Sequence, residues 1–410
     1  MLNFEQKLSN YADLIVQIGA NVQNGQSVIV NATVDAIHLV RLVVKKAYEA
    51  GAYQVKVVWH DDAVTRIKYD LAPEQSLLEE PKWSAGEKLE MAEQGAASIT
   101  ISSADPDLLK GVPLDRVNNA DKTLRKANEQ YRKYAQAFKF SWSLATVPSA
   151  AWAAKVFPDL PEEEQISRLW DAIFTMVRAD LPDPIASWEA HIQELHRRAK
   201  YLNDKSYKLL HYTAPGTDLS IELPEEQVWF GGSKSNEHGV MFVPNLPTEE
   251  VYTAPFRTGV NGTVTSTKPL SYNGNIIEQF SLSFENGRVV DVTAEQGVDV
   301  LKGLIETDEG SHYLGEVALV PHQSPISASN LLFYKTLFDE NASCHLAVGS
   351  AYTSCIKGGT KLTQKELLAK GINTSMAHTD FMVGSGQLDI YGITKDGVKE
   401  AVLLQGNWAF

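Results

Sequence analysis

The sequence predicts a two-domain chain in which a parallel-sheet α/β domain, residues 1–205, precedes a mainly antiparallel α+β domain, residues 206–410. Three observations support this class. The length of 410 residues exceeds the usual size of one domain. Strands and helices alternate early in the chain, as described below. The first 200 residues hold six of the 27 glycines and the remainder hold 21, which predicts more turns and hairpins in the second part.

Short β-branched runs alternate with helical patterns in the first part. Residues 36–50 place apolar side chains at helical spacing and end at Gly51, a residue suited to cap a helix C-terminus. The same reasoning predicts strands at residues 27–30, 54–59, 97–101 and 138–142, helices around 86–95 and 120–137, and a mostly helical stretch over 160–203. Strands separated by helices of this length predict a mostly parallel sheet with helices on both faces.

Alternation with period two marks the second part. Residues 219–223 and 280–284 each alternate apolar with polar side chains, as half-buried strands do. The Asn-Gly pair at 286–287 separates the second run from another apolar run at 289–292, and such a pair is a strong hairpin signal. Antiparallel strands should therefore dominate this part of the chain.

Composition excludes several classes of protein. The net charge is −14, and binding to a phosphate backbone requires clustered Lys and Arg, so nucleic acid is not an expected partner. Cys344 and Cys355 are too few for a disulfide framework and suit a reducing compartment, which predicts a cytoplasmic protein. No apolar stretch reaches the roughly 18 residues of a membrane span, and the N-terminus lacks the pattern of a signal peptide. We therefore expect no membrane association.

The first part lacks the signature of a nucleotide-binding loop. Residues 30–35 follow the first expected strand and contain no glycine, so neither the dinucleotide fingerprint nor a phosphate loop is present. We expect a structural α/β domain without a cofactor. His60, Asp61 and Asp62 follow a strand and could bind a metal, although such short clusters are more often solvated strand ends.

Two polar residues interrupt apolar segments in the second part. Glu316 is the only charged residue of 314–320, and His345 enters the apolar run 344–349. Burying a carboxylate is costly unless a cation or hydrogen bonds compensate it. A solvated edge position or a satisfied ion pair is the alternative for Glu316, and a hydrogen-bonded core histidine is the alternative for His345.

Two further candidates are pairs of residues. His378 and Asp380 are two positions apart, so on an extended strand they would face the same side and could bind one ion together. An orienting His–Asp pair without a metal is the alternative. Glu249 and Glu250 lie in the loop 245–255, which is bounded by prolines, and taken alone they indicate a solvated acidic loop.

Together these residues offer two histidines and three or four carboxylates within one domain. That mixed set of nitrogen and oxygen donors suits a pair of divalent ions such as zinc, cobalt or manganese. A bridging carboxylate can hold two metals roughly 3.5–4 Å apart, as in dinuclear aminopeptidases and phosphatases. Spacing along the chain does not by itself show that these residues converge.

At these residues the sequence resembles the aminopeptidase T family of dinuclear metallopeptidases, which includes thermophilic and staphylococcal aminopeptidases. The matching stretches are residues 245–255, 315–320, 341–352 and 378–385, and the resemblance runs through nearly the whole chain. It implies that two divalent metal ions are bound by five side chains: Glu250, Glu316, His345, His378 and Asp380. It also implies that Tyr352 is the active-site tyrosine. Glu249 is adjacent to Glu250, and we favour Glu250 as the ligand.

The resemblance also implies an activity and partners. The expected enzyme is a metallo-aminopeptidase that removes N-terminal residues from short peptides with a free N-terminus, by means of a metal-activated water. Zinc or cobalt is the expected metal, with magnesium or manganese as other choices. Tyr352 could stabilise the oxyanion, and Glu249 could act as general base, with a structural carboxylate as its alternative. Because the family forms homodimers with an enclosed cavity, we expect a homodimer.

Other classes of function remain open at this point. Another dinuclear hydrolase, such as a phosphoesterase, would need cations to hold phosphate oxygens, and the nearest one, Arg257, is expected to form a structural ion pair. A non-catalytic protein whose α/β domain binds a ligand would not need two histidines and several acids in apolar segments. Cys344 neighbours His345 and suggests a thiol nucleophile, but a small buried residue is the expected role because metal chemistry explains the whole set better.

Overall fold

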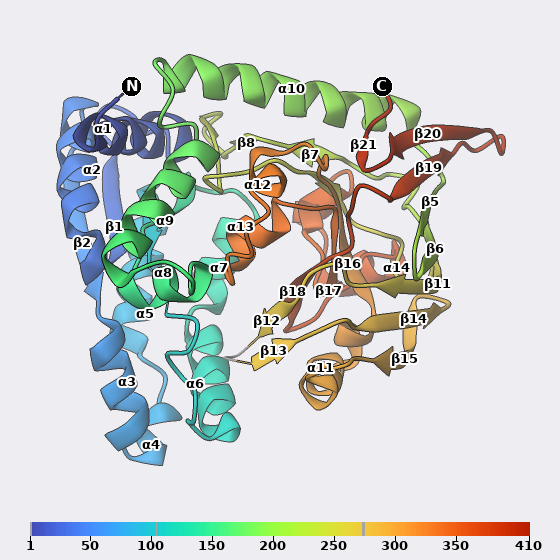
Figure 1. Ribbon diagram of the computed structural model, residues 1–410, viewed down its shortest axis with the longest axis horizontal. Coiled ribbons are helices and arrows are strands. Elements are labelled where there is room, and N and C mark those ends of the chain that lie inside the picture. Colours follow the sequence, from blue (N-terminus) through green and yellow to red (C-terminus); the bar gives the residue numbers. More distant parts are fainter. Residues whose placement is uncertain (1, 104, 273–274) are drawn as a thin grey trace. The chain divides into compact units, whose positions relative to one another are not determined.

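The computed structural model describes residues 2–103, 105–272 and 275–410, and its elements are labelled in Figure 1. The chain divides into two compact units. Unit 1 comprises Met1–Ala190 and Ser233–Pro247, and unit 2 comprises His191–Gly232 and Thr248–Phe410. The domain boundary expected after residue 205 stays a prediction. Within the described part of the chain, no helix combines the length and the apolar character needed to cross a membrane.

Unit 1 is built around a four-stranded parallel sheet, as the sequence predicts. The strand order is β2-β1-β3-β4. The strands are β1 (Ser27–Thr33), β2 (Gln54–His60), β3 (Ala97–Ser102) and β4 (Trp142–Thr146), with the short pair β8 (Lys234–Ser235) and β9 (Met241–Phe242). The helices are α1 (Phe4–Asp13), α2 (Ile37–Glu49), α3 (Asp62–Leu71), α4 (Glu74–Leu77), α5 (Lys82–Glu93), α6 (Leu114–Ala127), α7 (Glu129–Gln136), α8 (Ala150–Val156) and α9 (Glu162–Met176). Helix α10 (Pro184–Lys205) begins in unit 1 and ends in unit 2.

The expected strand at residues 138–142 is wrong. Helix α7 ends before Phe138, whose φ of 52° places it in the left-handed region, where an extended strand cannot continue. The Phe138 ring is buried and lies 6.2 Å from the ring of Phe242, so its apolar character reflects packing rather than a strand. Strand β4 begins only at Trp142. The helix expected over 120–137 is two helices, α6 and α7, that meet at Asn128.

Unit 2 contains antiparallel sheets, as predicted. An eight-stranded sheet has the order β15-β14-β11-β6-β5-β19-β20-β21, and a five-stranded sheet has the order β18-β17-β16-β10-β7. The strands of the larger sheet are β5 (Leu209–Ala214), β6 (Thr217–Glu222), β11 (Val260–Thr265), β14 (Ser281–Glu285), β15 (Arg288–Thr293), β19 (Asp389–Ile393), β20 (Lys399–Leu404) and β21 (Asn407–Trp408). The expected hairpin at 286–287 is confirmed, because both residues have positive φ and join β14 to β15.

The five-stranded sheet carries most of the candidate site residues. Its strands are β7 (Phe230–Gly231), β10 (Val251–Thr253), β16 (Leu314–Leu319), β17 (His345–Gly349) and β18 (His378–Met382), and a separate pair is formed by β12 (Leu270–Tyr272) and β13 (Asn275–Ile277). The remaining helices are α11 (Val298–Ile305), α12 (Pro325–Ala328), α13 (Thr336–Glu340) and α14 (Gln364–Ala369). Every residue of β16 and β17 is buried.

One face of this sheet belongs to the hydrophobic core of unit 2. Side chains that alternate along β16, β17 and β18 enter that core, among them Val317, Leu346, Val348 and Phe381. Because neighbouring residues of a strand point to opposite faces, the intervening side chains must lie on the other face. Those intervening residues include Glu316, His345, His378 and Asp380.

The turn at Gly287 provides a test of the fold. Gly287 has a φ of 83°, and an added Cβ would overlap the carbonyl oxygen of Arg257. Gly397 has a φ of 81°, but an added Cβ there would meet nothing within 4 Å. We expect G397A to lower the free energy of unfolding by roughly 1 kcal/mol, the cost of the left-handed conformation alone, and G287A by clearly more. Urea unfolding measures both, and equal losses would contradict the tight packing described here.

Candidate metal centre

Strand register gathers the predicted site residues on one face of the five-stranded sheet. Glu316 lies opposite Ala347, and Ala347 lies opposite Asp380, so the two carboxylates flank a small residue. Each histidine also has a small partner on one side: His345 lies between Ala318 and Met382, and His378 lies opposite Gly349. Small neighbours leave room on this face for the longer acidic and imidazole side chains. The alternation that predicted a shared face for His378 and Asp380 therefore extends over three strands.

Glu250 reaches the same site from the loop before β10. It stands two residues before Tyr252, which lies opposite Ala318, and its carboxylate Oε2 is 3.1 Å from Nε2 of His345. The preceding residue, Glu249, makes different contacts. Its Oε2 lies 3.5 Å from Nε2 of His191, and its backbone N–H donates to Oδ1 of Asn341 at 2.7 Å. These contacts support Glu250 over Glu249 as the residue that joins His345.

The side chains form two groups that share Glu316. One group is Glu250, Glu316 and His345, and the other is Glu316, His378 and Asp380; in each, the potential ligand atoms lie within 4.8 Å of one another. Oε1 of Glu316 is 3.9 Å from Nε2 of His345, and Oε2 is 3.5 Å from Nε2 of His378. Nε2 of His378 is also 3.6 Å from Oδ1 of Asp380. Each oxygen of Glu316 thus faces a different imidazole.

Backbone carbonyls orient both imidazoles. Nδ1 of His345 lies 3.1 Å from the carbonyl oxygen of Ser343, and Nδ1 of His378 lies 2.7 Å from that of Ser350. A carbonyl can only accept, so each Nδ1 carries the proton that it donates. Nε2 is then the nitrogen available to bind a metal ion, and it is the nitrogen that faces the carboxylates.

The electrostatics of this face indicate a place for cations. Burial raises the pKa of Glu316 to about 8, and the nearby charges of Asp380 and Glu250 add to the effect. Burial alone would lower the pKa of His345 and of His378. The hydrogen bond and charge of Glu250 instead raise the pKa of His345 well above its ordinary value, and Asp380 and Glu316 raise that of His378. In the absence of metal, protons must therefore offset the mutual repulsion of these carboxylates.

The donor set fits divalent metal ions. Three carboxylates and two imidazoles supply the mixed oxygen and nitrogen ligands that zinc, cobalt and manganese accept. Cations bound to the two groups would take the place of the protons and offset the same repulsion. Asn341, which is fully buried, helps to fix this arrangement because it accepts from Glu249 and donates to the carbonyl of Leu337.

Tyr352 lies beside the same cluster. Its ring centroid is 5.6 Å from that of His378 and 5.7 Å from that of Tyr252. Burial raises the pKa of the Tyr352 hydroxyl well above its ordinary value, and the charges of Glu316 and Asp380 raise it further. The hydroxyl therefore stays protonated at neutral pH and can donate a hydrogen bond.

The structure adds Glu340, which the sequence reasoning missed. Burial raises its pKa well above the ordinary value, and the charges of Asp380 and Glu250 act in the same direction. Asn341 donates to its Oε1 at 3.4 Å. A signal was present in the sequence, because Glu340 immediately precedes the matching stretch 341–352 and lies five residues before His345.

Several of the alternatives considered for single residues are wrong. Glu316 is not a solvated edge residue, since β16 lies inside the sheet and the residue is 5% exposed. Glu249 and Glu250 are not a solvated loop, at 4% and 8% exposure. Cys344 is a small buried residue, and burial raises the pKa of its thiol to about 12, which does not favour a thiolate nucleophile.

The remaining candidates lie outside the two groups. Among the residues that the structure describes, the two clusters with metal-ligand geometry are both in unit 2, so His60, Asp61 and Asp62 are not part of one. Arg257 lies 3.7 Å from Glu309, in agreement with the structural ion pair expected for it.

Fold and site together define a class: a mixed α/β protein whose second unit presents side chains able to hold divalent cations. The chain belongs to the M29 family of thermophilic metalloproteases, whose family model matches residues 4–408. It is 53% identical over 410 residues to aminopeptidase AmpS of Bacillus subtilis, with both chains fully covered. It is 40% identical over 405 residues to aminopeptidase T of Thermus thermophilus, with 99% of each chain covered. The solved structure of wild-type AmpT from Thermus thermophilus superposes with a TM-score of 0.94 at 39% identity and full coverage of both chains. The resemblance to aminopeptidase T is confirmed.

The raised pKa values make a prediction for the metal-free protein. Between pH 4.5 and about 8, folded Glu316 keeps a proton that the unfolded chain has lost, so stability must fall as pH rises. His345 and His378 act in the same direction, because their raised pKa values stabilise the folded state at low pH and this contribution disappears at high pH. We expect the melting temperature of the chelated protein to fall by several degrees over this range. Glu316→Gln should flatten the slope, and a melting temperature that rises with pH would contradict the account.

Proposed function

We propose that this metalloprotease is an aminopeptidase that uses two divalent cations, one held by Glu250, Glu316 and His345 and the other by Glu316, His378 and Asp380. The observation that carries the proposal is the shared carboxylate of Glu316, whose two oxygens face the two histidines. The names of the relatives, all aminopeptidases, support the type of reaction. The donor set supports zinc or cobalt, with magnesium and manganese as weaker candidates.

The chain's own residues supply the remaining parts of peptide hydrolysis. Divalent cations bound at such a site lower the pKa of water and polarise a carbonyl group. Tyr352, which keeps its proton, would donate a hydrogen bond to the carbonyl oxygen of the scissile bond as negative charge develops there. A carboxylate outside the two groups would take the proton of the attacking water and pass it to the leaving amine.

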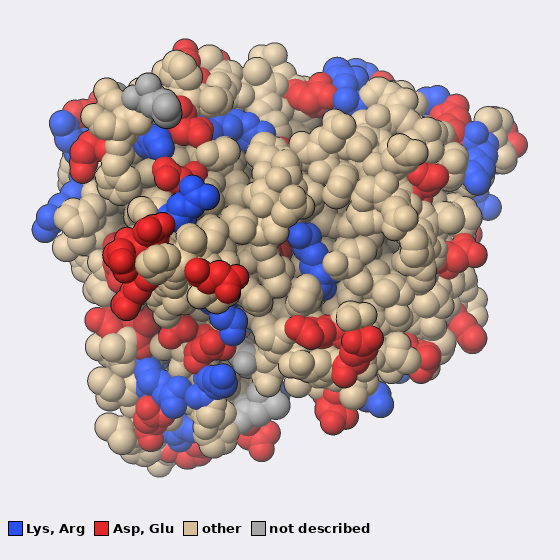
Figure 2. All heavy atoms as spheres, in the orientation of Figure 1, with Lys and Arg blue, Asp and Glu red and all other residues tan. Residues whose placement is uncertain are grey.

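Substrate recognition follows from the charge of the site. An exopeptidase must recognise the free α-amino group of its substrate, either through a bound cation or through an acidic side chain, and Glu249 and Glu340 are buried acids outside the two groups that could serve. We propose short peptides as substrates for this reason. Nucleic acid is not proposed as a partner, and Figure 2 shows Lys and Arg interspersed with Asp and Glu on the face it displays.

The proposal extends to assembly and location. Helix α3 exposes a row of apolar side chains at helical spacing, Val64, Ile67 and Leu71, which are 63%, 56% and 78% exposed. This row supports a homodimer, because exposed apolar surface favours association. Cys344 and Cys355 are both buried thiols, which supports a reducing location such as the cytoplasm.

Metal removal tests the proposed function directly. We expect the purified chain to hydrolyse leucyl-p-nitroanilide, to lose this activity on thorough chelation and to regain it with zinc or cobalt. His345→Ala and Glu316→Gln should each lower kcat/KM by more than about 100-fold, since metal polarisation contributes several kcal/mol to catalysis. Full activity after chelation would refute the metal mechanism. Turnover of a phosphoester without any peptide hydrolysis would favour a phosphoesterase instead.

Two carboxylates compete for the role of general base. Glu249 is the residue named for this role from the sequence, with a structural carboxylate as its alternative, and its contacts with His191 and Asn341 suit a positioning role. Burial and the charges of Asp380 and Glu250 raise the pKa of Glu340, which supports Glu340 as a second candidate. We expect Glu340→Gln to lower kcat by about 100-fold or more and Glu249→Gln to lower it by much less. Steady-state kinetics of the two amide variants separates the candidates. The opposite ranking would restore Glu249.

A further inference from the structure

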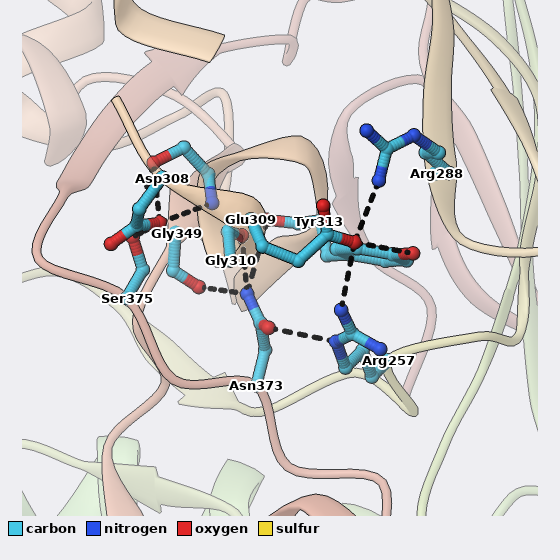
Figure 3. A network of polar contacts seen from close by, with 10 residues as sticks. Arg257, Arg288, Asp308, Glu309, Gly310, Tyr313, Gly349, Asn373 and Ser375 are labelled. Atoms are coloured by element: carbon cyan, nitrogen blue, oxygen red, sulfur yellow. Dashed lines mark hydrogen bonds and ion pairs between the residues drawn. The ribbon is translucent and has the colours of Figure 1, made fainter. Parts of the chain in front are cut away.

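Asn373 occupies the centre of a polar network behind the candidate metal centre. It is fully buried in the segment that leads into β18, five residues before His378. Figure 3 shows its amide between Gly349 on one side and Arg257 on the other, with Gly310 and Tyr313 close by. The catalytic scheme above assigns no task to this residue.

Arg257 fixes the orientation of the Asn373 amide. Nε of Arg257 donates to Oδ1 of Asn373 at 3.0 Å, and because a guanidinium can only donate, the other end of the amide must be its NH₂ group. Nδ2 donates to the carbonyl oxygens of Gly349 at 2.6 Å and Gly310 at 2.8 Å, with a longer contact of 3.4 Å to Tyr313. A buried amide with both ends satisfied in this way has one orientation.

Arg257 is itself held in place from several directions. Its guanidinium lies 3.6 Å from the centre of the Tyr313 ring and 3.7 Å from Glu309. Glu309 is also paired with Arg288 at 2.7 Å, and the backbone N–H of Arg257 donates to the carbonyl of Gly371. The donor that orients Asn373 is therefore held by contacts on several sides (Figure 3).

The target of Asn373 is the segment that orients one of the imidazoles. The side chain binds the carbonyl of Gly349, and the backbone carbonyl of Asn373 accepts from the N–H of Ala351 at 3.0 Å. Between these two anchors stands Ser350, whose carbonyl accepts from Nδ1 of His378. Tyr352 follows directly. Asn373 thus forms hydrogen bonds with the residues on both sides of Ser350, whose carbonyl orients the His378 ring.

Backbone packing around this segment leaves little freedom. An added Cβ at Gly315 would overlap the carbonyl of Gly349, and an added Cβ at Gly349, whose φ is 105°, would overlap the carbonyl of Ala377. Chains in such close contact transmit a displacement directly to their neighbours. A shift of Gly349 would therefore move Ser350 and Tyr352.

We infer that Asn373, oriented by Arg257, is a positioning residue that sets the imidazole of His378 for metal binding and places Tyr352 beside it. This inference rests on the proposed metal centre. Asn373 touches neither group of ligands, so its effect is transmitted through the carbonyl of Ser350.

Asn373→Asp tests the inference against a matched control. The variant keeps the shape and the acceptor for Arg257 but removes the NH₂ donor. Asn236→Asp makes the same change at another buried asparagine, whose Oδ1 accepts from two backbone N–H groups and whose Nδ2 donates to Ser141 in unit 1. Zinc affinity is measured on the chelated protein by competition with a chromophoric chelator. Asn373→Asp should weaken it about 10-fold at one site, as loss of an outer ligand contact does, while Asn236→Asp leaves it unchanged.

A second readout follows the imidazole itself. With ¹⁵N-histidine labelling, the Nδ1–H signal of His378, assigned by its loss in His378→Gln, should shift or exchange faster in Asn373→Asp and stay unchanged in Asn236→Asp. If Asn373→Asp fails to fold, Arg257→Met removes the orienting donor, together with the guanidinium contacts to Glu309 and Tyr313, and the same changes are expected at smaller size. Wild-type zinc affinity and an unchanged His378 signal in a folded variant would overturn the inference. Failure of the wild-type chain to bind zinc would instead overturn the proposed function.

Discussion

The structure of unit 2 depends on one constraint, the burial of like charges. Glu250, Glu316 and Asp380 converge on one face of the five-stranded sheet, and the pKa of about 8 for Glu316 shows how strongly burial and its neighbours oppose ionisation. A buried, uncompensated carboxylate is among the costliest features a fold can hold. The arrangement is stable only with counter-charges, either protons in the metal-free protein or cations in the working enzyme. Function and stability are therefore coupled through the same side chains.

The two faces of the sheet have different roles, since one stabilises the fold and the other carries the candidate metal centre. On the far face, Val317, Leu346 and Phe381 enter the hydrophobic core, and each fully buried side chain of this size stabilises the fold by about 1.5–3 kcal/mol. That apolar face keeps the strands in register without help from the site. The near face can then carry repelling groups at fixed separations, since Ala347 stands between Glu316 and Asp380 and leaves them space. A rigid sheet supplies the preorganisation that a metal site needs.

Local patterns in the sequence were sufficient for much of this arrangement. Period two placed His378 and Asp380 on one face, and the single charge in 314–320 marked Glu316 as unusual. Local patterns failed where a backbone conformation or a distant contact determines the structure. The left-handed φ of Phe138, just after the end of α7, excludes the strand expected to begin there. The position of Glu340 beside the matching stretch 341–352 was a signal, but the packing of α13 against β18, which carries Asp380, is a distant contact that the sequence pattern does not show.

The two imidazoles differ in how they are held, and this difference follows from chain connectivity. His345 donates to the carbonyl of Ser343, two residues earlier on its own chain segment, so its orientation is a local property of β17. His378 donates to Ser350, 28 residues away, and thus depends on the segment that Asn373 holds. A disturbance of the network around Arg257 would reach one imidazole and leave the other in place. Because Glu316 faces both, the group with His378 is the one whose geometry the rest of the unit can adjust.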